Sequence, residues 1–204
     1  MTDRPTHVLE RRSLLRAVGA GAAGGVAGCL GGGPSANGSD GDSDGSPPQV
    51  YEPTMENVDE GPFEFPEGHG CAVCSMPATD YPGRKGQLVH ENGLAAVFDS
   101  PGCLFAYKVS STPDSPIAGA WTTDYETGSL IDATAAHFVL ITDEQAAEDP
   151  MGIDPRPFAA REDATAFLEE WTAEELTEDD VIVGLEPVDM EIAAIYRGNR
   201  LPTE

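Results

Sequence analysis

A short run of soft ligand atoms lies at residues 69–76, whose sequence is His-Gly-Cys-Ala-Val-Cys-Ser-Met. Cys71, Cys74 and Met76 carry sulfur, and His69 adds an imidazole next to them. Thiolates and thioethers select Cu(I), zinc or iron–sulfur clusters over hard cations. The thioether favours Cu(I), because zinc rarely binds methionine. We therefore predict a Cu(I) site with Cys74 and Met76 as its main ligands.

The spacing of Cys74 and Met76 suits one shared ion. In an extended segment, side chains two residues apart point to the same side. Both sulfur atoms would then reach the ion without a helix or a special turn. The alternative interpretation is a buried thiol beside a core methionine, and both are common in proteins.

Cys71 and Cys74 form a Cys-x-x-Cys pair, which serves zinc, copper and redox sites alike. Structural zinc requires four ligands, and the sequence has no second Cys-x-x-Cys or suitably spaced histidine pair. A disulfide between these two cysteines, or thioredoxin-like exchange, remains an alternative. The redox alternative is weaker because Pro77 follows the pair, where a thioredoxin-like motif would begin a helix.

Five other residues carry side chains that bind metals in other proteins. We predict that His69 could add a nitrogen ligand and that Met151 could add a second thioether, if the two halves of the domain pack together. Cys103 is expected to be a core thiol. His90 and His137 lie in strand-like runs and are expected to be structural.

Residues 1–28 predict an export signal rather than a folded element. Residues 11–16 (Arg-Arg-Ser-Leu-Leu-Arg) match a twin-arginine core, and the apolar stretch behind them is shorter than the roughly 20 residues of a membrane span. Residues 26–29 (Val-Ala-Gly-Cys) resemble a lipobox. We therefore expect a lipid on Cys29 that anchors the protein to the extracytoplasmic face of the cell membrane. The alternative is an unlipidated signal with a chance cysteine.

The region after the signal is acidic and begins with a linker. Residues 29–50 are mostly Gly, Ser, Asp, Asn and Pro, a composition that predicts a flexible, disordered segment. The whole chain has 11 basic and 36 acidic residues, giving a formal charge of −25 at pH 7. This charge excludes nucleic-acid binding. Acidic residues spread along the domain, which is typical of proteins from halophiles.

Residues 51–190 are predicted to form one domain built from two similar units. In the first unit, strand-like runs at 87–91 and 94–98 flank Asn92-Gly93, a strong hairpin signal. A helix follows, capped by Ser100 and begun by Pro101, and then a strand at 117–123.

The second unit repeats this order of elements. A strand at 136–142 precedes a short strand that ends at Phe158, an amphipathic helix at 161–172 and a last strand at 181–185. The predicted fold class is α+β, with two ββαβ-type units and antiparallel sheets. Residues 191–204 are polar and are expected to be a tail.

Several short motifs occur in a defined order along residues 60–185. They are Cys74-Ser75-Met76, Tyr81-Pro82-Gly83-Arg84-Lys85-Gly86-Gln87, Phe98-Asp99-Ser100, Tyr107, Trp121, Asp124-Tyr125, Ala136, Phe138-Val139, Met151-Gly152, Pro157-Phe158 and Ala166-Phe167. This ordered set resembles the NosL-type accessory lipoproteins of nitrous-oxide reductase. The sequence departs from that family at Ser75, where the family usually has glycine. A serine there costs of order 1 kcal/mol if the position has a positive φ.

The resemblance implies a pair of ββαβ units and a Cu(I)-binding metallochaperone that is not an enzyme. Such proteins deliver copper for the copper centres of nitrous-oxide reductase in denitrification, alongside a membrane transport complex. The reductase and that complex are therefore the implied partners. Two alternatives remain at this point: a thiol-disulfide oxidoreductase lipoprotein that uses Cys71 and Cys74, and a binding lipoprotein with structural cysteines.

Overall fold

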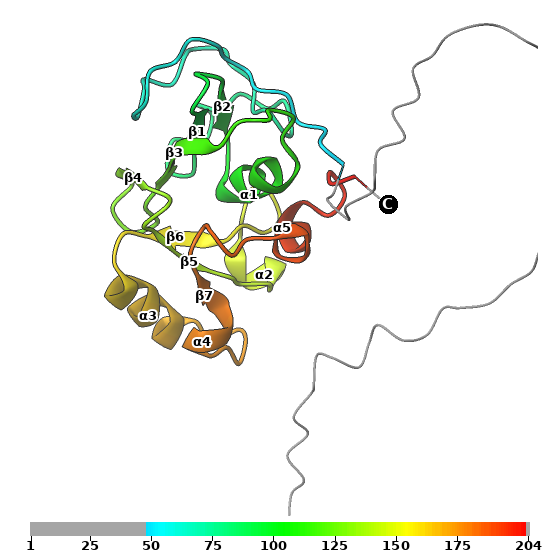
Figure 1. Ribbon diagram of the computed structural model, residues 1–204. Coiled ribbons are helices and arrows are strands. Elements are labelled where there is room, and N and C mark those ends of the chain that lie inside the picture. The colour runs from blue at the N-terminus through cyan, green and yellow to red at the C-terminus, as the bar shows by residue number, and fades with distance from the viewer. Residues whose placement is uncertain (1–47, 203–204) are drawn as a thin grey trace, which may run out of the picture. The chain divides into compact units, whose positions relative to one another are not determined.

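The computed structural model describes residues 48–202, shown as the coloured ribbon in Figure 1. The predicted signal, Cys29 and most of the predicted linker lie outside the described residues. Within the described part of the chain, none of the helices has the length and apolar character needed to cross a membrane.

The described chain contains both strands and helices. In chain order they are β1 (Gly86–His90), β2 (Ala95–Phe98), α1 (Pro101–Ser110), β3 (Ile117–Thr123), β4 (Leu130–Asp132), β5 (His137–Val139), α2 (Glu144–Ala147), β6 (Arg156–Phe158), α3 (Arg161–Glu170), α4 (Glu178–Val181), β7 (Ile182–Val183) and α5 (Met190–Arg197).

The first sheet has the strand order β2-β1-β3-β4, and all its neighbouring strands are antiparallel. The predicted hairpin between β1 and β2 is confirmed. Gly93 takes a φ of 78° in its turn, and the Leu94 N–H donates to Asn92 Oδ1 at 3.2 Å. Glycine adopts this left-handed conformation without a steric penalty, so Asn92-Gly93 fixes the register of the pair.

The second sheet repeats the first on a smaller scale. Its order is β6-β5-β7, again antiparallel, so each unit places its first strand between the second and the third. Phe98 ends β2 and Phe158 ends β6, which confirms their matching places. The predicted two ββαβ units are therefore confirmed. Strand β5 stops at Val139, short of the predicted Thr142, because its partner β7 has only two residues with which to pair.

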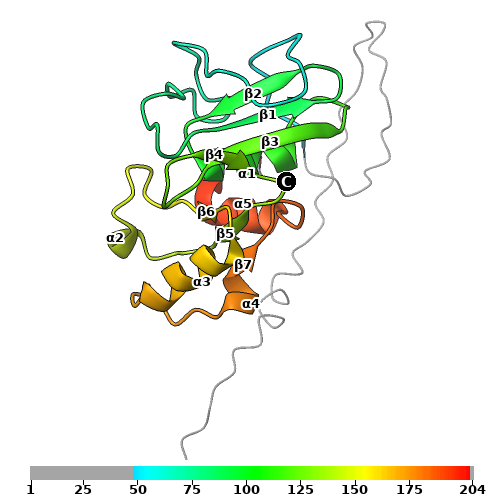
Figure 2. The same cartoon turned by 90° about the vertical axis from the view of Figure 1, so that its left-hand side faces the viewer.

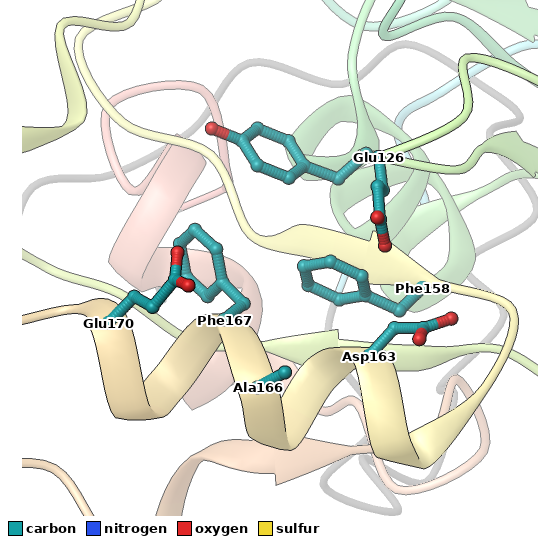
Figure 3. A pocket seen from close by; sticks show the side chains of 7 residues that line it. Glu126, Phe158, Asp163, Ala166, Phe167 and Glu170 are labelled. Atoms are coloured by element: carbon teal, nitrogen blue, oxygen red, sulfur yellow. The ribbon is translucent and has the colours of Figure 1, made fainter.

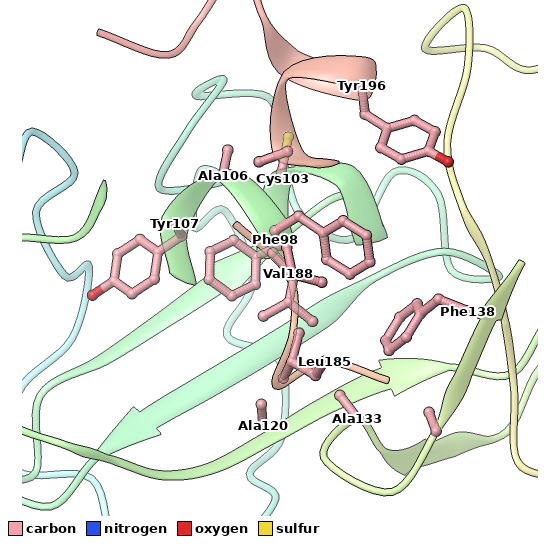
Figure 4. Packing of buried hydrophobic residues seen from close by; sticks show 14 of the residues in the cluster. Phe98, Cys103, Ala106, Tyr107, Ala120, Ala133, Phe138, Leu185, Val188 and Tyr196 are labelled. Atoms are coloured by element: carbon pink, nitrogen blue, oxygen red, sulfur yellow. The ribbon is translucent and has the colours of Figure 1, made fainter. Parts of the chain in front are cut away.

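Helix α1 lies in the middle of the molecule, and α3 lies at its surface. Figures 1 and 2 show α1 and α5 between the two sheets, with α3 on the far side of the second sheet. The predicted cap is confirmed, because the Ser100 side chain accepts a hydrogen bond from the Cys103 N–H at 3.3 Å and Pro101 begins the helix. Phe105 of α1 meets Phe138 of β5 edge-on, with ring centres 4.9 Å apart. Figure 4 shows Phe98 of the first unit and Phe138 of the second in the same cluster of buried side chains. One core therefore joins the two units.

The expected tail at 191–204 is wrong for the described residues, because Met190–Arg197 form helix α5. The Asp189 side chain caps this helix by accepting from the Ile192 N–H at 2.9 Å, and Ala193 and Tyr196 are buried. The helix packs against α1. The sequence pattern hid it because one of its buried side chains is Arg197, which a local hydrophobicity pattern assigns to solvent.

Candidate metal centre

The side chains of four residues whose types can bind metals converge close to where β2 leads into α1. The ligand atoms of Cys71, Cys74, Asp99 and Cys103 all lie within 4.8 Å of one another, and all four residues are buried. They come from three segments, namely the loop at 70–77, the residue after β2 and the first turn of α1. We call these four residues the sulfur cluster.

The loop that carries Cys71 and Cys74 is a tight turn. The Cys71 N–H donates to the Met76 carbonyl at 2.7 Å, and the Ser75 N–H donates to the Cys71 carbonyl at 2.9 Å. Ser75 closes this turn with a φ of 63°. The expectation that Cys74 to Met76 form an extended segment is therefore wrong, and the positive φ considered for Ser75 is what the structure has.

The same loop is tied to the first sheet. The Ala72 N–H donates to the carbonyl of Val97 in β2 at 3.0 Å. Because Asp99 lies two residues after Val97, this bond holds the two cysteines of the loop beside Asp99. The thiol of Cys74 lies 3.2 Å from Asp99 Oδ2, at hydrogen-bond distance for a sulfur donor. The other carboxylate oxygen, Asp99 Oδ1, is buried without a hydrogen-bond partner in the described chain.

A buried oxygen without a partner is costly and needs an explanation. A bound cation is one group that would satisfy Asp99 Oδ1, and an oxygen of the same carboxylate lies within 4.8 Å of three sulfur atoms. The donor set of three thiols and one carboxylate fits a soft cation rather than Mg²⁺ or Ca²⁺, which prefer shells made of oxygen. The residues present therefore fit copper.

The thiols of the sulfur cluster are electrostatically unequal. The pKa of Cys74 is lowered to about 4, because the thiols of Cys103 and Cys71 donate hydrogen bonds to its sulfur. The pKa of Cys71 is raised, first by its hydrogen bond with Cys103 and then by the one with Cys74, because both stabilise its protonated form. Burial raises the pKa of Asp99. Cys74 is thus more readily deprotonated than Cys71, and thiolates are the form that binds metals.

A fixed positive charge lies beside the sulfur cluster. Arg197 of α5 donates from Nε to Cys103 Sγ at 3.2 Å, and its Nη2 contacts both oxygens of Asp154 at 2.8 and 3.0 Å. Arg197 and Asp154 are almost completely buried. This guanidinium offsets part of the negative charge that bound thiolates would place in the core.

The structure brings together two of the five predicted metal ligands. Cys71 and Cys74 belong to the sulfur cluster, and half-buried Met76 packs against the buried core that contains them. His69 is half-buried one residue before the loop and is not among the four converging residues. Met151 lines a separate cavity beside α5, together with Ile153.

Sequence reasoning missed Asp99 and Cys103 as members of the site. Cys103 is a core thiol as expected, with no exposed surface, but it also faces the other cysteines. Asp99 was noted only as part of the Phe98-Asp99-Ser100 motif. A usable signal was the helix start itself, because Ser100 and Pro101 fix where α1 begins and place Cys103 in its first turn.

The described cysteines are free thiols rather than a disulfide. The segment after Cys74 is a turn that leads to an isolated bridge between Gly70 and Pro77, with no helix in that part of the described chain. This geometry differs from the strand-to-helix junction of thioredoxin-like redox motifs. His90 is structural as predicted, because its ring nitrogens contact the Ser115 carbonyl and the Tyr107 hydroxyl.

Comparisons with known proteins point to one family. The NosL family model matches residues 62–183. The chain is 32% identical over 117 residues to the copper-binding lipoprotein NosL of Stutzerimonas stutzeri; the match takes in 52% of this chain and 58% of that protein. It thus spans less than two thirds of that relative's length. A crystal structure of the copper chaperone NosL from Shewanella denitrificans superposes with a TM-score of 0.51 at 20% identity, covering 65% of this chain and 98% of that one.

Proposed function

The chain belongs to the NosL family, and on this basis we propose that it is a Cu(I)-binding metallochaperone and not an enzyme. Copper is its cargo, held at the sulfur cluster and passed to a recipient protein. The observation that carries this proposal is the burial of three sulfur atoms within 4.8 Å of one another and of a carboxylate. Both relatives above bear names that refer to copper.

Cys74 is the central ligand in this proposal, because its lowered pKa favours the thiolate form that binds metals. Cys71 and Cys103 are within reach of the same ion, and one carboxylate oxygen of Asp99 lies within 4.8 Å of all three sulfur atoms. Met76 provides the thioether that distinguishes a copper site from a zinc site. Cu(I) accepts two or three soft ligands, so not all of these groups need to bind at once.

Release of the ion is proposed to occur through the loop at 70–77. Met76 and His69 are half-buried, whereas Cys71, Cys74 and Cys103 are buried. A Cu(I) ion that leaves the thiolates would meet these more exposed donors first and could pass outward by ligand exchange. Met151 would contribute only after a rearrangement of its cavity beside α5, and we keep it as a secondary candidate.

The recipient and the location follow from the resemblance and the N-terminal signal. We propose that the protein is exported by the twin-arginine route, lipidated at Cys29 and held on the extracytoplasmic face of the cell membrane. Its recipient would be nitrous-oxide reductase or the membrane complex that delivers copper to that enzyme. Changing Cys29 to Ser should move the protein from the membrane fraction to the soluble fraction, and unchanged membrane retention would contradict the anchor.

Anaerobic titration of the reduced protein against a competing Cu(I) chelator tests the copper proposal. We expect one Cu(I) per chain, and Cys74→Ser should abolish stoichiometric binding because it replaces the central thiolate with a hard oxygen. Met76→Leu preserves volume and apolar character, so the fold should survive within about 1.5 kcal/mol while copper binds more weakly. Absence of competition with weak chelators as well as strong ones would remove the carrier function.

Thiol-disulfide exchange is the second candidate function, and the lowered pKa of Cys74 favours it. A redox enzyme would respond to the same variants in the opposite way. Met76→Leu would leave its turnover and its copper affinity unchanged, and Cys71→Ser would end disulfide turnover. Measuring exchange rates and Cu(I) affinity on the same variants therefore separates the two functions.

A further inference from the structure

A second concave site lies in the other half of the molecule, between α3 and the turn after β3 (Figure 3). It is a cleft of about 240 Å³ walled by the rings of Tyr125, Phe158 and Phe167. Pockets for drug-sized ligands usually measure about 300–1,000 Å³. This cleft, which we call the aromatic cleft, therefore has the size for one side chain rather than for a whole small molecule.

The walls of the aromatic cleft hold one another in place. Tyr125 meets Phe158 and Phe167 edge-on, with ring centres 5.7 and 5.3 Å apart. Trp171 stacks on Phe167, with ring centres 5.6 Å apart. Phe158 is only 2% exposed, but 48% of Tyr125 faces solvent. The cleft is thus preformed, with an aromatic face open to a ligand.

Three carboxylates surround these rings. In Figure 3, Glu126 and Asp163 lie beside Phe158 at one end of the cleft, and Glu170 lies beside Phe167 at the other. All three residues are exposed, and among the described residues their carboxylates have no hydrogen-bond or ion-pair partner.

The combination of aromatic faces and free carboxylates selects the ligand. The carboxylates would repel an anion. A neutral apolar group would displace water from the carboxylates without offering them hydrogen bonds in return. A guanidinium group suits both the rings and the carboxylates, because it stacks on aromatic faces and donates paired hydrogen bonds to carboxylates. A contact between a guanidinium and one of these rings already exists within the molecule, since the guanidinium carbon of Arg156 lies 5.0 Å from the centre of the Tyr125 ring.

We infer that the aromatic cleft binds an arginine side chain on an exposed segment of a partner protein. The guanidinium would lie against Tyr125 and Phe167, and its N–H groups would donate to Asp163 or Glu170. None of these residues belongs to the sulfur cluster, so the cleft could hold a partner while copper occupies its own site. The inference does not depend on copper binding.

Nuclear magnetic resonance titration with short peptides tests this inference on the exported chain in its Cys29→Ser form. The probe is a blocked Gly-Arg-Gly peptide, and the same peptide with citrulline keeps the shape but removes the charge. We expect the arginine peptide to shift resonances of residues lining the cleft, and the citrulline peptide to bind about tenfold more weakly. Equal binding of both peptides, or shifts spread over the whole acidic surface, would overturn the inference.

Two pairs of matched variants sharpen the test. Glu170→Gln should weaken binding of the arginine peptide several-fold, whereas Glu169→Gln on the same helix removes the same charge outside the cleft and should have little effect. Tyr125→Leu should weaken binding, and Tyr125→Phe should retain it, because the ring is preserved. Equal losses for the two glutamate variants would show non-specific attraction and reject the site. Preferential binding of a lysine peptide would also reject an arginine site.

Cu(I) titration of Glu170→Gln keeps this inference separate from the proposed function. We expect unchanged copper stoichiometry, because Glu170 lines the aromatic cleft and is not part of the sulfur cluster. Loss of copper binding in this variant would contradict the independence of the two sites.

Discussion

The two ββαβ units have the same strand order but different chemistry where the second strand gives way to the helix. In the first unit Phe98 is followed by Asp99 and, five residues after the phenylalanine, by Cys103. At the corresponding positions of the second unit Phe158 is followed by Ala159 and Asp163. One junction therefore forms part of a buried sulfur cluster, and the other forms part of an open aromatic cleft.

The two junctions differ because different elements of the molecule cover the helix that follows each of them. Helix α1 lies between the two sheets beside α5, and eight of its ten residues are buried. Helix α3 lies on an outer face, and Ala164 is its only buried residue. The first helix can therefore carry thiols away from water, whereas the second presents carboxylates to it. Two units with the same strand order can therefore carry different side-chain chemistry, depending on which elements cover their helices.

The largest expected effect compares a buried arginine with an exposed one. Arg197→Met should lower the free energy of unfolding by about 3 kcal/mol, because it removes one of the two guanidinium groups that pair with the buried Asp154. Arg161→Met should cost no more than about 1 kcal/mol, because its pair with Glu178 is exposed and 3.4 Å long. Urea unfolding measures both. Similar losses would mean that burial does not distinguish the packing around α1 and α5 from the outer face of α3.

The second prediction concerns acid stability. Burial opposes ionisation of Asp149, but hydrogen bonds from Arg84 and Arg156 outweigh it and hold the pKa of Asp149 below its usual value. The folded state therefore binds this proton less readily than the unfolded state, so its contribution is full above about pH 4 and is lost as the pH falls further.

Asp149→Asn should therefore cost about 2 kcal/mol at pH 7 and flatten the loss of stability below about pH 4. Asp154 does not obscure this window, because burial raises its pKa to about 6 and it titrates at higher pH. Asp163→Asn in the aromatic cleft is the matched control and should change little. Unfolding curves from pH 2 to 7 provide the measurement; an unchanged acid slope in Asp149→Asn would be the contrary result.

The smallest effect concerns the loop of the sulfur cluster. Ser75 has a φ of 63°, where a side chain costs of order 1 kcal/mol and glycine does not. Ser75→Gly should therefore raise the free energy of unfolding by about 1 kcal/mol. Asn57→Gly is the control at a φ of 57°, and its gain should be smaller because asparagine tolerates this conformation. Thermal unfolding of the two variants is the measurement. A loss of stability in Ser75→Gly would show that the backbone at Ser75 is not strained.

Local signals predicted much of the fold. The Asn92-Gly93 turn, the Ser100 cap and the repeated order of elements each depend on residues that are near one another in the sequence. Helix α5 escaped prediction because Arg197 is buried by contacts with Asp154 and Cys103, which lie 43 and 94 residues away along the chain.

The candidate site was predictable to the extent that its ligands share one loop. Cys71 and Cys74 were found from their spacing, but the turn at Ser75 contradicts the extended geometry used to pair Cys74 with Met76. Asp99 and Cys103 join the site only because the bond from Ala72 to Val97 docks the loop on the first sheet. Such docking depends on tertiary structure, which spacing along the chain does not reveal.

X-ray absorption at the copper edge tests the central claim most directly, because it identifies the atoms bound to the metal. The reduced protein, loaded with one equivalent of Cu(I), should show a first shell dominated by sulfur. Cys103→Ala should lower its sulfur content if that thiol is a ligand, and Cys74→Ala should remove stoichiometric loading. A first shell dominated by nitrogen or oxygen, or an unchanged spectrum in Cys74→Ala, would contradict copper binding at the sulfur cluster.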